Sequence, residues 1–214
     1  MPEKQPPRAR KRPKQSRSVL AVQSIREACI KILNAEGADR LTTERIADVA
    51  GVNIASVYQY FPNKEAIIAE VYEELLADMA ARAATRFHDI QALADRSLAD
   101  TLSAIIDMEC EQLLTLQNLD PSFFREYQHS FDIHRRVNEL TQSQSNPSWE
   151  EWLDLLLDQH ACAGDSRLRG LLVRQTLQGN LRITLQEQPE LLESPSYRRE
   201  LLTLLLAYLQ VTSR

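Results

Sequence analysis

Segment 53–60 carries side chains whose types and spacing suit binding to a large polar molecule. In a helix, Val57 and Phe61 lie about one turn apart, so they share a face that we expect to be buried. On the opposite face, a hydroxyl and an amide can hydrogen-bond to base edges, a methyl group can contact thymine, and phenols can donate to phosphates. A merely solvated surface is the alternative, but it gives no reason for two tyrosines. The expected outward-facing residues are Ala55, Ser56, Tyr58, Gln59 and Tyr60.

Capping residues and one glycine predict the two short helices that position this surface. Thr42 or Thr43 caps the first of them, and Gly51 closes it at a position that favours a left-handed backbone. Asn53 then caps the second helix, which Pro62 ends. Two short helices joined by a tight turn with a glycine form a helix-turn-helix.

Prolines and caps divide the rest of the chain into helices. Four of the nine prolines lie before residue 14, and the others interrupt long stretches that contain none, which is typical of an all-α chain. An apolar face from Val22 to Leu33 predicts a helix before the helix-turn-helix, ending at Gly37. Further caps predict six more helices, at 63–87, 97–117, 121–141, 148–161, 166–187 and 195–211.

Residues 41–65 read LTTERIADVAGVNIASVYQYFPNKE. This segment resembles the DNA-binding domain of the tetracycline-repressor (TetR) family, and the resemblance covers about residues 19–72. It implies phosphate contacts from Thr43, Tyr58, Tyr60 and Lys64. Asn53, the cap of the second short helix, is also expected among the DNA-binding residues. The resemblance also implies that the rest of the chain is an all-helical domain for dimerisation and ligand binding. The expected domains are therefore an arm at 1–18, a helix-turn-helix domain at 19–65 and a helical domain at 66–214.

The basic arm, residues 1–18, has seven basic residues and one acidic residue, although the whole chain has a net charge of −5. It contains too few apolar residues to bury a core, so we expect it to be disordered until it meets a polyanion. A solubilising tail is the alternative. Residues 19–62 carry four basic and five acidic residues, so electrostatic affinity for DNA must come largely from the arm and Lys64. The arm residues expected to contact DNA are Arg8, Arg10, Lys11 and Arg12.

The last two predicted helices are apolar around most of their circumference, which one buried face does not require. Packing across a two-fold axis in a homodimer uses both sides, and two helix-turn-helix half-sites on a palindromic operator need such a dimer. A core within one chain is the alternative. The expected interface residues are Leu168, Leu172, Gly179, Leu201, Leu202, Leu205 and Leu209.

A small-molecule pocket is expected between the fourth and eighth helices. Glu109 lies on an apolar helix face, where an unpaired carboxylate is costly, so it either pairs with Arg125, Arg135 or Arg174 or faces a polar cavity. The aromatic residues form either its lining or an interlocked core. The pocket favours a mainly apolar effector with one or two polar groups. The candidate ligand contacts are Glu109, Gln112, Phe123, Phe124, Tyr127, Phe131, His134, Trp149 and Trp152.

Several functional classes have no support in the sequence. The five glycines match neither common nucleotide-binding spacing, the four histidines lack metal-ligand spacing, and no nucleophile motif occurs, so we expect no enzyme, cofactor or metal. Three cysteines without a CxxC pair and the lack of a signal peptide or apolar span favour the cytoplasm. The sequence therefore predicts a ligand-responsive transcriptional repressor. The alternative is a helical ligand carrier or protein-interaction module that does not engage DNA.

Overall fold

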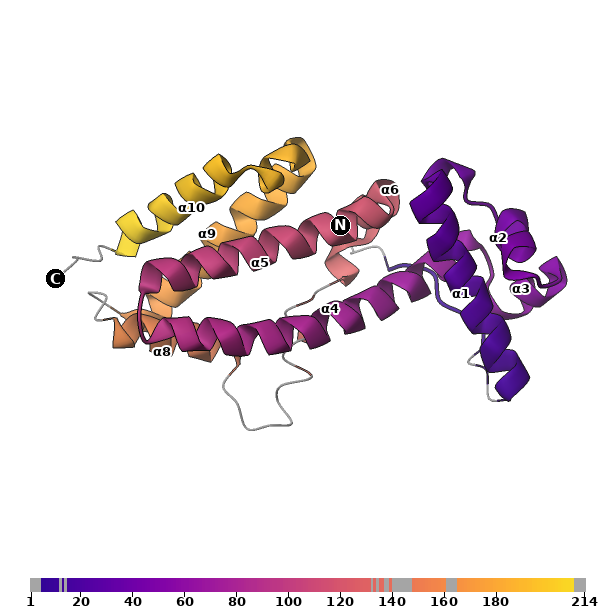
Figure 1. Cartoon of the computed structure of the whole chain (residues 1–214), viewed down its shortest axis with the longest axis horizontal. Helices are drawn as coiled ribbons and strands as arrows, with labels where there is room; N and C mark the ends of the chain where they lie inside the picture. The colour runs from indigo at the N-terminus through magenta and orange to yellow at the C-terminus, as the bar shows by residue number, and fades with distance from the viewer. Residues whose placement is uncertain are drawn as a thin grey trace. The chain divides into compact units, whose positions relative to one another are not determined.

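The computed structural model describes residues 5–11, 13, 15–131, 133, 135–136, 139, 148–160 and 165–209. These residues form helices and no strands, as the sequence predicts (Figure 1). Helices of this part of the chain are α1 (Ser16–Glu36), η1 (Ala38–Arg40), α2 (Thr43–Ala50), α3 (Ile54–Tyr60), α4 (Lys64–Ala94), α5 (Leu98–Leu119), α6 (Pro121–Tyr127), η2 (Gln128–Ser130), α8 (Trp149–Gln159), α9 (Ser166–Glu187), η4 (Pro189–Glu193) and α10 (Pro195–Leu209).

Contacts divide the chain into two compact units. The first unit contains residues 1–78 and 116–132, and the second contains residues 79–115 and 133–214. The division therefore falls within α4 and α5, because each of these helices contributes one part to each unit. None of the helices in the described ranges is long and apolar enough to cross a membrane.

In the first unit, α1 packs against α2, and both helices contact α3. The buried side of α1 includes Ile25, Cys29 and Ile32, each at most 1% exposed. Burial raises the pKa of the Cys29 thiol to about 12, because the apolar surroundings disfavour the thiolate. The predicted first helix and its end at Gly37 are confirmed, although the helix begins at Ser16, inside the basic arm.

Tyr72 on α4 organises the rest of the first unit. Its hydroxyl donates to the carbonyl oxygens of Leu116 (2.8 Å) and Asp120 (3.1 Å) and accepts from the Asp120 backbone N–H (3.2 Å). Asp120 in turn caps α6 by accepting from the Phe123 N–H. Burial raises the pKa of Tyr72 well above its usual range. The phenol therefore stays protonated and ties α4 to the segment around α6.

The predicted helix 121–141 is interrupted in its middle, and the described residues beyond the break, 133, 135, 136 and 139, are helical again. Helix α6 ends at Tyr127, a 3₁₀ turn covers 128–130, and Phe131 has a non-helical backbone. The physical reason is the aromatic core: Phe131 stacks on Tyr72, with ring centroids 4.8 Å apart. A continuing helix would carry Phe131 past this contact. The other five predicted helices beyond Pro62 are found, with α4 extending seven residues further than predicted.

In the second unit, α8 packs on α9, and α9 contacts both η4 and α10. A capping box fixes the start of α8, with Ser148 and Glu151 each accepting a backbone N–H of the other. Phe87 packs edge-on against both tryptophans of α8, and Arg198 on α10 donates to Asp107 on α5 at 2.9 Å. These contacts hold the described helices of the second unit around one core.

Candidate nucleic-acid interface

The turn between α2 and α3 is built as its sequence predicts. Thr42 is the residue that caps α2, since its hydroxyl accepts from the Arg45 N–H at 3.0 Å. Gly51 has φ 67° and ψ 31°, the left-handed conformation that disfavours a side chain. Asn53 caps α3 by accepting the Ala55 N–H at 2.8 Å. Three local devices thus set the geometry of the helix-turn-helix.

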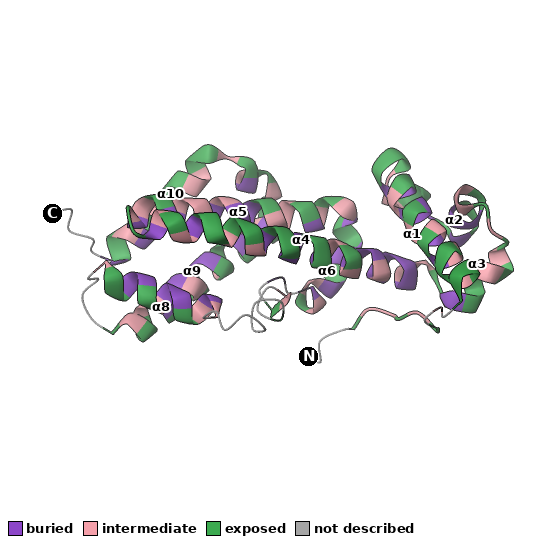
Figure 2. Cartoon of the chain, turned by 60° about the horizontal axis from the view of Figure 1, so that its bottom comes forward, coloured by how far each residue is buried: buried purple, intermediate pink, exposed green. Residues whose placement is uncertain are grey.

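The outer face of α3 is accessible. Val57 is fully buried, so this inward contact fixes the rotation of the helix. Ser56 is half-buried, and Figure 2 shows exposed residues on the visible side of α3. The exposed members of the predicted site on this helix and its cap are Asn53, Ala55, Tyr58 and Gln59. Small and polar groups therefore surround one aromatic side chain, as a base-reading surface requires.

Tyr60 corrects the prediction that both tyrosines point outward. Its side chain is 9% exposed, against 40% for Tyr58. The reason is helical spacing: Tyr60 follows the buried Val57 by three residues, which places both on the inner face. Phe61, predicted to belong to that face, is buried too, but it lies just beyond the helix as its cap.

Thr43 and Lys64 lie at the starts of α2 and α4, where the resemblance places phosphate contacts. Thr43 is 9% exposed. Lys64 is half-buried, and its Nζ donates to the Leu41 carbonyl oxygen at 3.1 Å. This hydrogen bond uses one of three ammonium donors. Lys64 can therefore bind the backbone just before α2 and still donate to an anion.

The described part of the basic arm runs up to α3 (Figure 2). The Arg10 backbone N–H donates to the Tyr60 carbonyl oxygen at 2.7 Å, and its guanidinium donates to the Tyr58 carbonyl oxygen at 3.2 Å. The sequence predicts a disordered arm and does not predict these two hydrogen bonds to α3. Arg8 and Lys11 are exposed, and Arg12 lies outside the described residues.

Near the first helix-turn-helix cap, Arg45 forms an ion pair that the sequence reasoning missed. Its guanidinium donates to Glu36 at 2.6 Å, and this hydrogen bond lowers the pKa of Glu36. Both side chains line an open surface hollow together with Asp39, Arg40 and Thr42. Because both partners are exposed, we attribute little stability to the pair.

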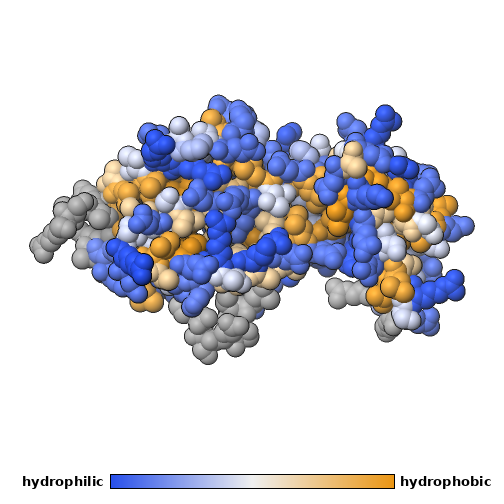
Figure 3. All heavy atoms as spheres, in the orientation of Figure 1, coloured by the Kyte–Doolittle hydropathy of each residue, from blue (hydrophilic) through white to orange (hydrophobic). Residues whose placement is uncertain are grey.

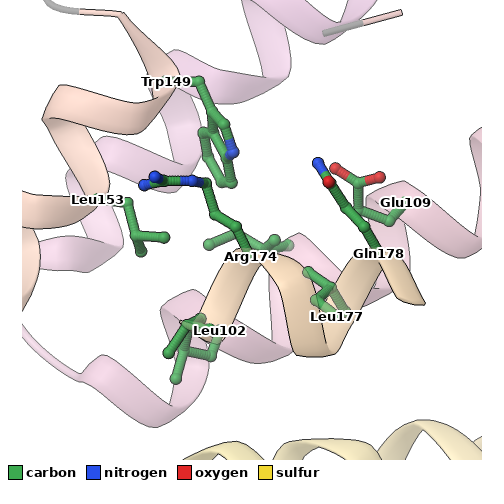
Figure 4. Close-up of a pocket in the computed structure, with 9 residues that line it drawn as sticks. Leu102, Glu109, Trp149, Leu153, Arg174, Leu177 and Gln178 are labelled. Carbon is green, nitrogen blue, oxygen red and sulfur yellow. The ribbon is translucent and has the colours of Figure 1, made fainter. Parts of the chain in front are cut away.

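A small cavity in the second unit contains part of the predicted ligand site. Its volume is about 10 Å³, which is room for roughly one water molecule, whereas drug-sized ligands need at least about 300 Å³. Glu109, 5% exposed, and Trp149 line it, and Figure 4 shows Glu109 beside Gln178. Arg174 lines it too and lies 3.5 Å from Asp154. The other lining residues are Leu102, Ile105, Leu153, Val173 and Leu177.

The remaining predicted ligand residues do not line this cavity. In the first unit, Phe123 and Phe124 stack on Tyr72 with Phe131, and Tyr127 packs on Phe123 at 4.7 Å. These four rings pack in the first unit, whereas Trp149 and Trp152 stack on each other in the second, so a pocket shared with the tryptophans stays a prediction. Gln112 is half-buried, and His134 lies outside the described residues.

The predicted dimer residues fall into two groups. Leu201, Leu205 and Leu209 are at most 4% exposed within the single chain, so they are corrected to residues of its own core. Leu202 and Gly179 are half-buried. Leu168 and Leu172 are 54% and 37% exposed. The sequence prediction of the interface did not name four further exposed apolar residues on these two helices: Leu171, Ile183, Leu204 and Tyr208.

The apolar residues that remain exposed on α9 and α10 are the ones available to a partner. Figure 3 shows apolar atoms reaching the surface among hydrophilic ones around α10.

Within the described residues, no group of three or more potential metal ligands comes together. Cys29 and Cys110 are buried free thiols, and burial raises the pKa of Cys110 to about 11.

Comparisons with known proteins agree with this geometry. Residues 25–71 match the family described as bacterial regulatory proteins, tetR family. The nucleoid occlusion factor SlmA of Haemophilus ducreyi is 35% identical over 85 residues, which are 37% of this chain and 41% of SlmA. SlmA of Actinobacillus pleuropneumoniae is 32% identical over 85 residues, 39% of this chain and 40% of that protein. The chain thus matches about two fifths of the length of these curated relatives.

A solved structure shares the whole fold. The TetR-family transcriptional regulator from Streptomyces coelicolor is 21% identical, with a TM-score of 0.50, over 90% of this chain and 97% of that one. The match to the family model covers α2, α3 and the turn between them, which are the elements built by the caps and Gly51. Residues 25–71 therefore form a domain of the tetR family of bacterial regulatory proteins.

Proposed function

We propose that this protein is a DNA-binding transcriptional regulator that binds a palindromic operator as a homodimer. The observation that carries the proposal is the accessible outer face of α3, held by a helix-turn-helix whose caps and left-handed glycine are in place. The family match over residues 25–71 supports it. Such a helix fits the major groove, where base pairs present distinct hydrogen-bonding patterns.

Within this proposal, the residues of the interface have separate roles. Ser56 and Gln59 read base edges through hydrogen bonds, and Ala55 contacts a thymine methyl group. Tyr58 and Lys64 donate to phosphates, and the free backbone N–H groups at the start of α2, where the buried Thr43 lies, bind a phosphate oxygen. Tyr60 is left out of the base-reading and phosphate-binding set because the residue is only 9% exposed.

The homodimer is proposed to form through the exposed apolar residues of α9 and α10. Leu168 and Leu172 repeat after four residues on α9, and Leu204 and Tyr208 do so on α10, so each pair makes an apolar stripe. Burying these stripes against a second copy stabilises the dimer by about 25 cal/mol per Å² of apolar surface. A two-fold pairing then presents two α3 helices to two half-sites.

The proposed regulation is release from the operator when a small molecule binds the second unit. With a volume of about 10 Å³, the cavity near Glu109 must widen to admit a ligand. A ligand that binds only the widened form favours that form by its difference in affinity. The lining favours a largely apolar molecule whose polar groups meet Glu109, Arg174 or Gln178. We assign the protein no catalytic role and place it in the cytoplasm.

The second candidate is a helical ligand carrier or protein-interaction module that does not engage DNA. The observation in its favour is charge: residues 19–62 carry one more acidic than basic residue. A cation-poor surface gains little from the release of counterions on DNA binding. This candidate therefore predicts no sequence preference among DNA duplexes.

Selection of duplexes from a random-sequence library by the full chain separates the two candidates. We expect enrichment of a palindromic sequence and saturable binding of two protomers per duplex, measured by fluorescence anisotropy and sedimentation. Gln59→Ala should lower discrimination between the selected duplex and its base-pair variants by about 1–3 kcal/mol. A library that emerges unenriched would contradict the proposal and favour the second candidate.

A further inference from the structure

Two hydrogen bonds join the basic arm to the last turn of α3. The Arg10 backbone N–H donates to the Tyr60 carbonyl oxygen at 2.7 Å, and Nη1 of its guanidinium donates to the Tyr58 carbonyl oxygen at 3.2 Å. Arg10 and Tyr58 are 48 residues apart in sequence. The contact is therefore tertiary, and it attaches an otherwise irregular segment to the helix that carries the base-reading residues.

The chemistry of a helix end explains why an arginine lies here. The last carbonyl groups of a helix have no partner within it, and together they carry a partial negative charge that favours a cation. At the end of α3, the Phe61 N–H donates to the Val57 carbonyl oxygen, and Arg10 supplies donors to two of the carbonyls that follow. Arg10 is thus engaged with protein acceptors rather than pointing freely into solvent.

This attachment places two further cations beside α3. Arg8 and Lys11 are both exposed, and they lie two residues and one residue from Arg10. Consecutive Cα atoms are about 3.8 Å apart, so the Cα atoms of Arg8 and Lys11 lie within about 8 Å of the Cα atom of Arg10. The exposed Tyr58 and Gln59 belong to the same end of α3. Residues 19–62 carry a net charge of −1. Arg8 and Lys11 add two positive charges beside α3, so they make the surface around this helix more favourable for a polyanion.

We propose that Arg10 is a positioning residue, which docks the basic arm on the C-terminal end of α3 so that Arg8 and Lys11 contact phosphates next to the DNA segment that α3 reads. This inference rests on the proposed function. Its distinctive consequence is a fixed register between arm and helix. An undocked cationic arm would instead contact phosphates diffusely along the duplex.

Variants of the full chain test the proposal on a duplex selected from a random-sequence library. In hydroxyl-radical footprinting, the wild type should protect nucleotides at one defined position beside those protected by α3. Arg10→Ala should abolish this outer protection and keep the inner one, although Arg8 and Lys11 are still present. Arg10→Lys keeps a cationic donor and the backbone N–H, so it should restore the outer protection in part.

A double-mutant cycle gives the second readout. Combined Arg8→Ala and Lys11→Ala should weaken binding roughly tenfold and reduce the slope of log affinity against log salt by about 2, since two phosphate contacts are lost. In the Arg10→Ala background, the same two substitutions should weaken DNA binding by about twofold or less, because undocked cations contribute little to affinity at that site. Arg199→Ala removes one exposed charge from α10 and serves as the matched control, with no change in footprint.

The outcomes separate the inference from the function on which it rests. If Arg10→Ala retains the outer protection, or if the losses from all three residues simply add, Arg10 does not dock the arm and the inference is wrong while the DNA-binding function stands. If the wild type protects no nucleotides on any selected duplex, both are wrong. Thermal melts of each variant should coincide with that of the wild type, since Arg8, Arg10 and Lys11 are exposed.

Discussion

The helix-turn-helix and the cavity of the second unit differ in what positions their functional residues. In the helix-turn-helix, Thr42, Gly51 and Asn53 each act on backbone groups within a few residues of themselves. Around the cavity, Glu109 and Arg174 come from α5 and α9, so their meeting depends on how whole helices pack. Local chemistry defines the first site, whereas tertiary packing defines the second. The first kind can be predicted from one sequence far better than the second.

The comparison is tested most strongly by placing a charge on α10 and on α9. Leu205 is 1% exposed, so Leu205→Glu buries a carboxylate in the core of the second unit and should cost about 4 kcal/mol or more. Leu168 is 54% exposed, so Leu168→Glu should leave the fold intact and dissociate the proposed dimer. Urea denaturation and sedimentation measure the two effects. Equal unfolding by both variants would contradict the separation of core from interface.

Those two leucines also show what a sequence can and cannot define. The apolar circumference of α10 predicts contacts on more than one side, but it cannot say which leucines face the chain's own core. Tyr60 was misplaced for the same reason: only the observed rotation of α3 shows that it shares the face of Val57. By contrast, Gly51 and Asn53 were predicted because a left-handed turn and an N-cap have local signatures.

The aromatic residues near α6 give the second test. Phe123 is 5% exposed and stacks on Tyr72 at 5.2 Å, so Phe123→Ala should destabilise the first unit by about 3–5 kcal/mol. Tyr58→Ala, on the exposed face of α3, should change stability by less than about 0.5 kcal/mol. Thermal or urea unfolding measures both. If Phe123→Ala kept full stability, its ring would belong to a ligand site rather than to the core.

Two glycines of α9 give a third, smaller test within one helix. A Cβ at Gly170 would lie 1.9 Å from Asp154 Oδ1, so Gly170→Ala must displace Asp154 from its ion pair with Arg174. We expect a loss of about 1–3 kcal/mol. A Cβ at Gly179 meets nothing within 4 Å of its own chain, so Gly179→Ala should raise stability by up to about 1 kcal/mol through helix propensity.

The glycine pair is measured by urea unfolding at several protein concentrations. A Gly179→Ala variant that is less stable only at concentrations where the wild type dimerises would show that a second copy packs closely at this position. Such a result would add Gly179 to the interface, as the sequence predicts. Stabilisation independent of concentration would exclude that role.

The smallest expected effect concerns the cap of α2, and it tests how much one local hydrogen bond contributes to the helix-turn-helix. Thr42 accepts the Arg45 N–H at 3.0 Å, so Thr42→Ala leaves this donor without its partner and should cost about 1 kcal/mol. Thr42→Ser keeps the hydroxyl and should remain within a few tenths of a kcal/mol of the wild type. Because α2 is eight residues long, fraying of its first turn should also weaken DNA binding, since Thr43 lies in that turn. A Thr42→Ala variant with wild-type stability and wild-type affinity would show that packing of Ile46 and Ala47, rather than the cap, defines the start of α2.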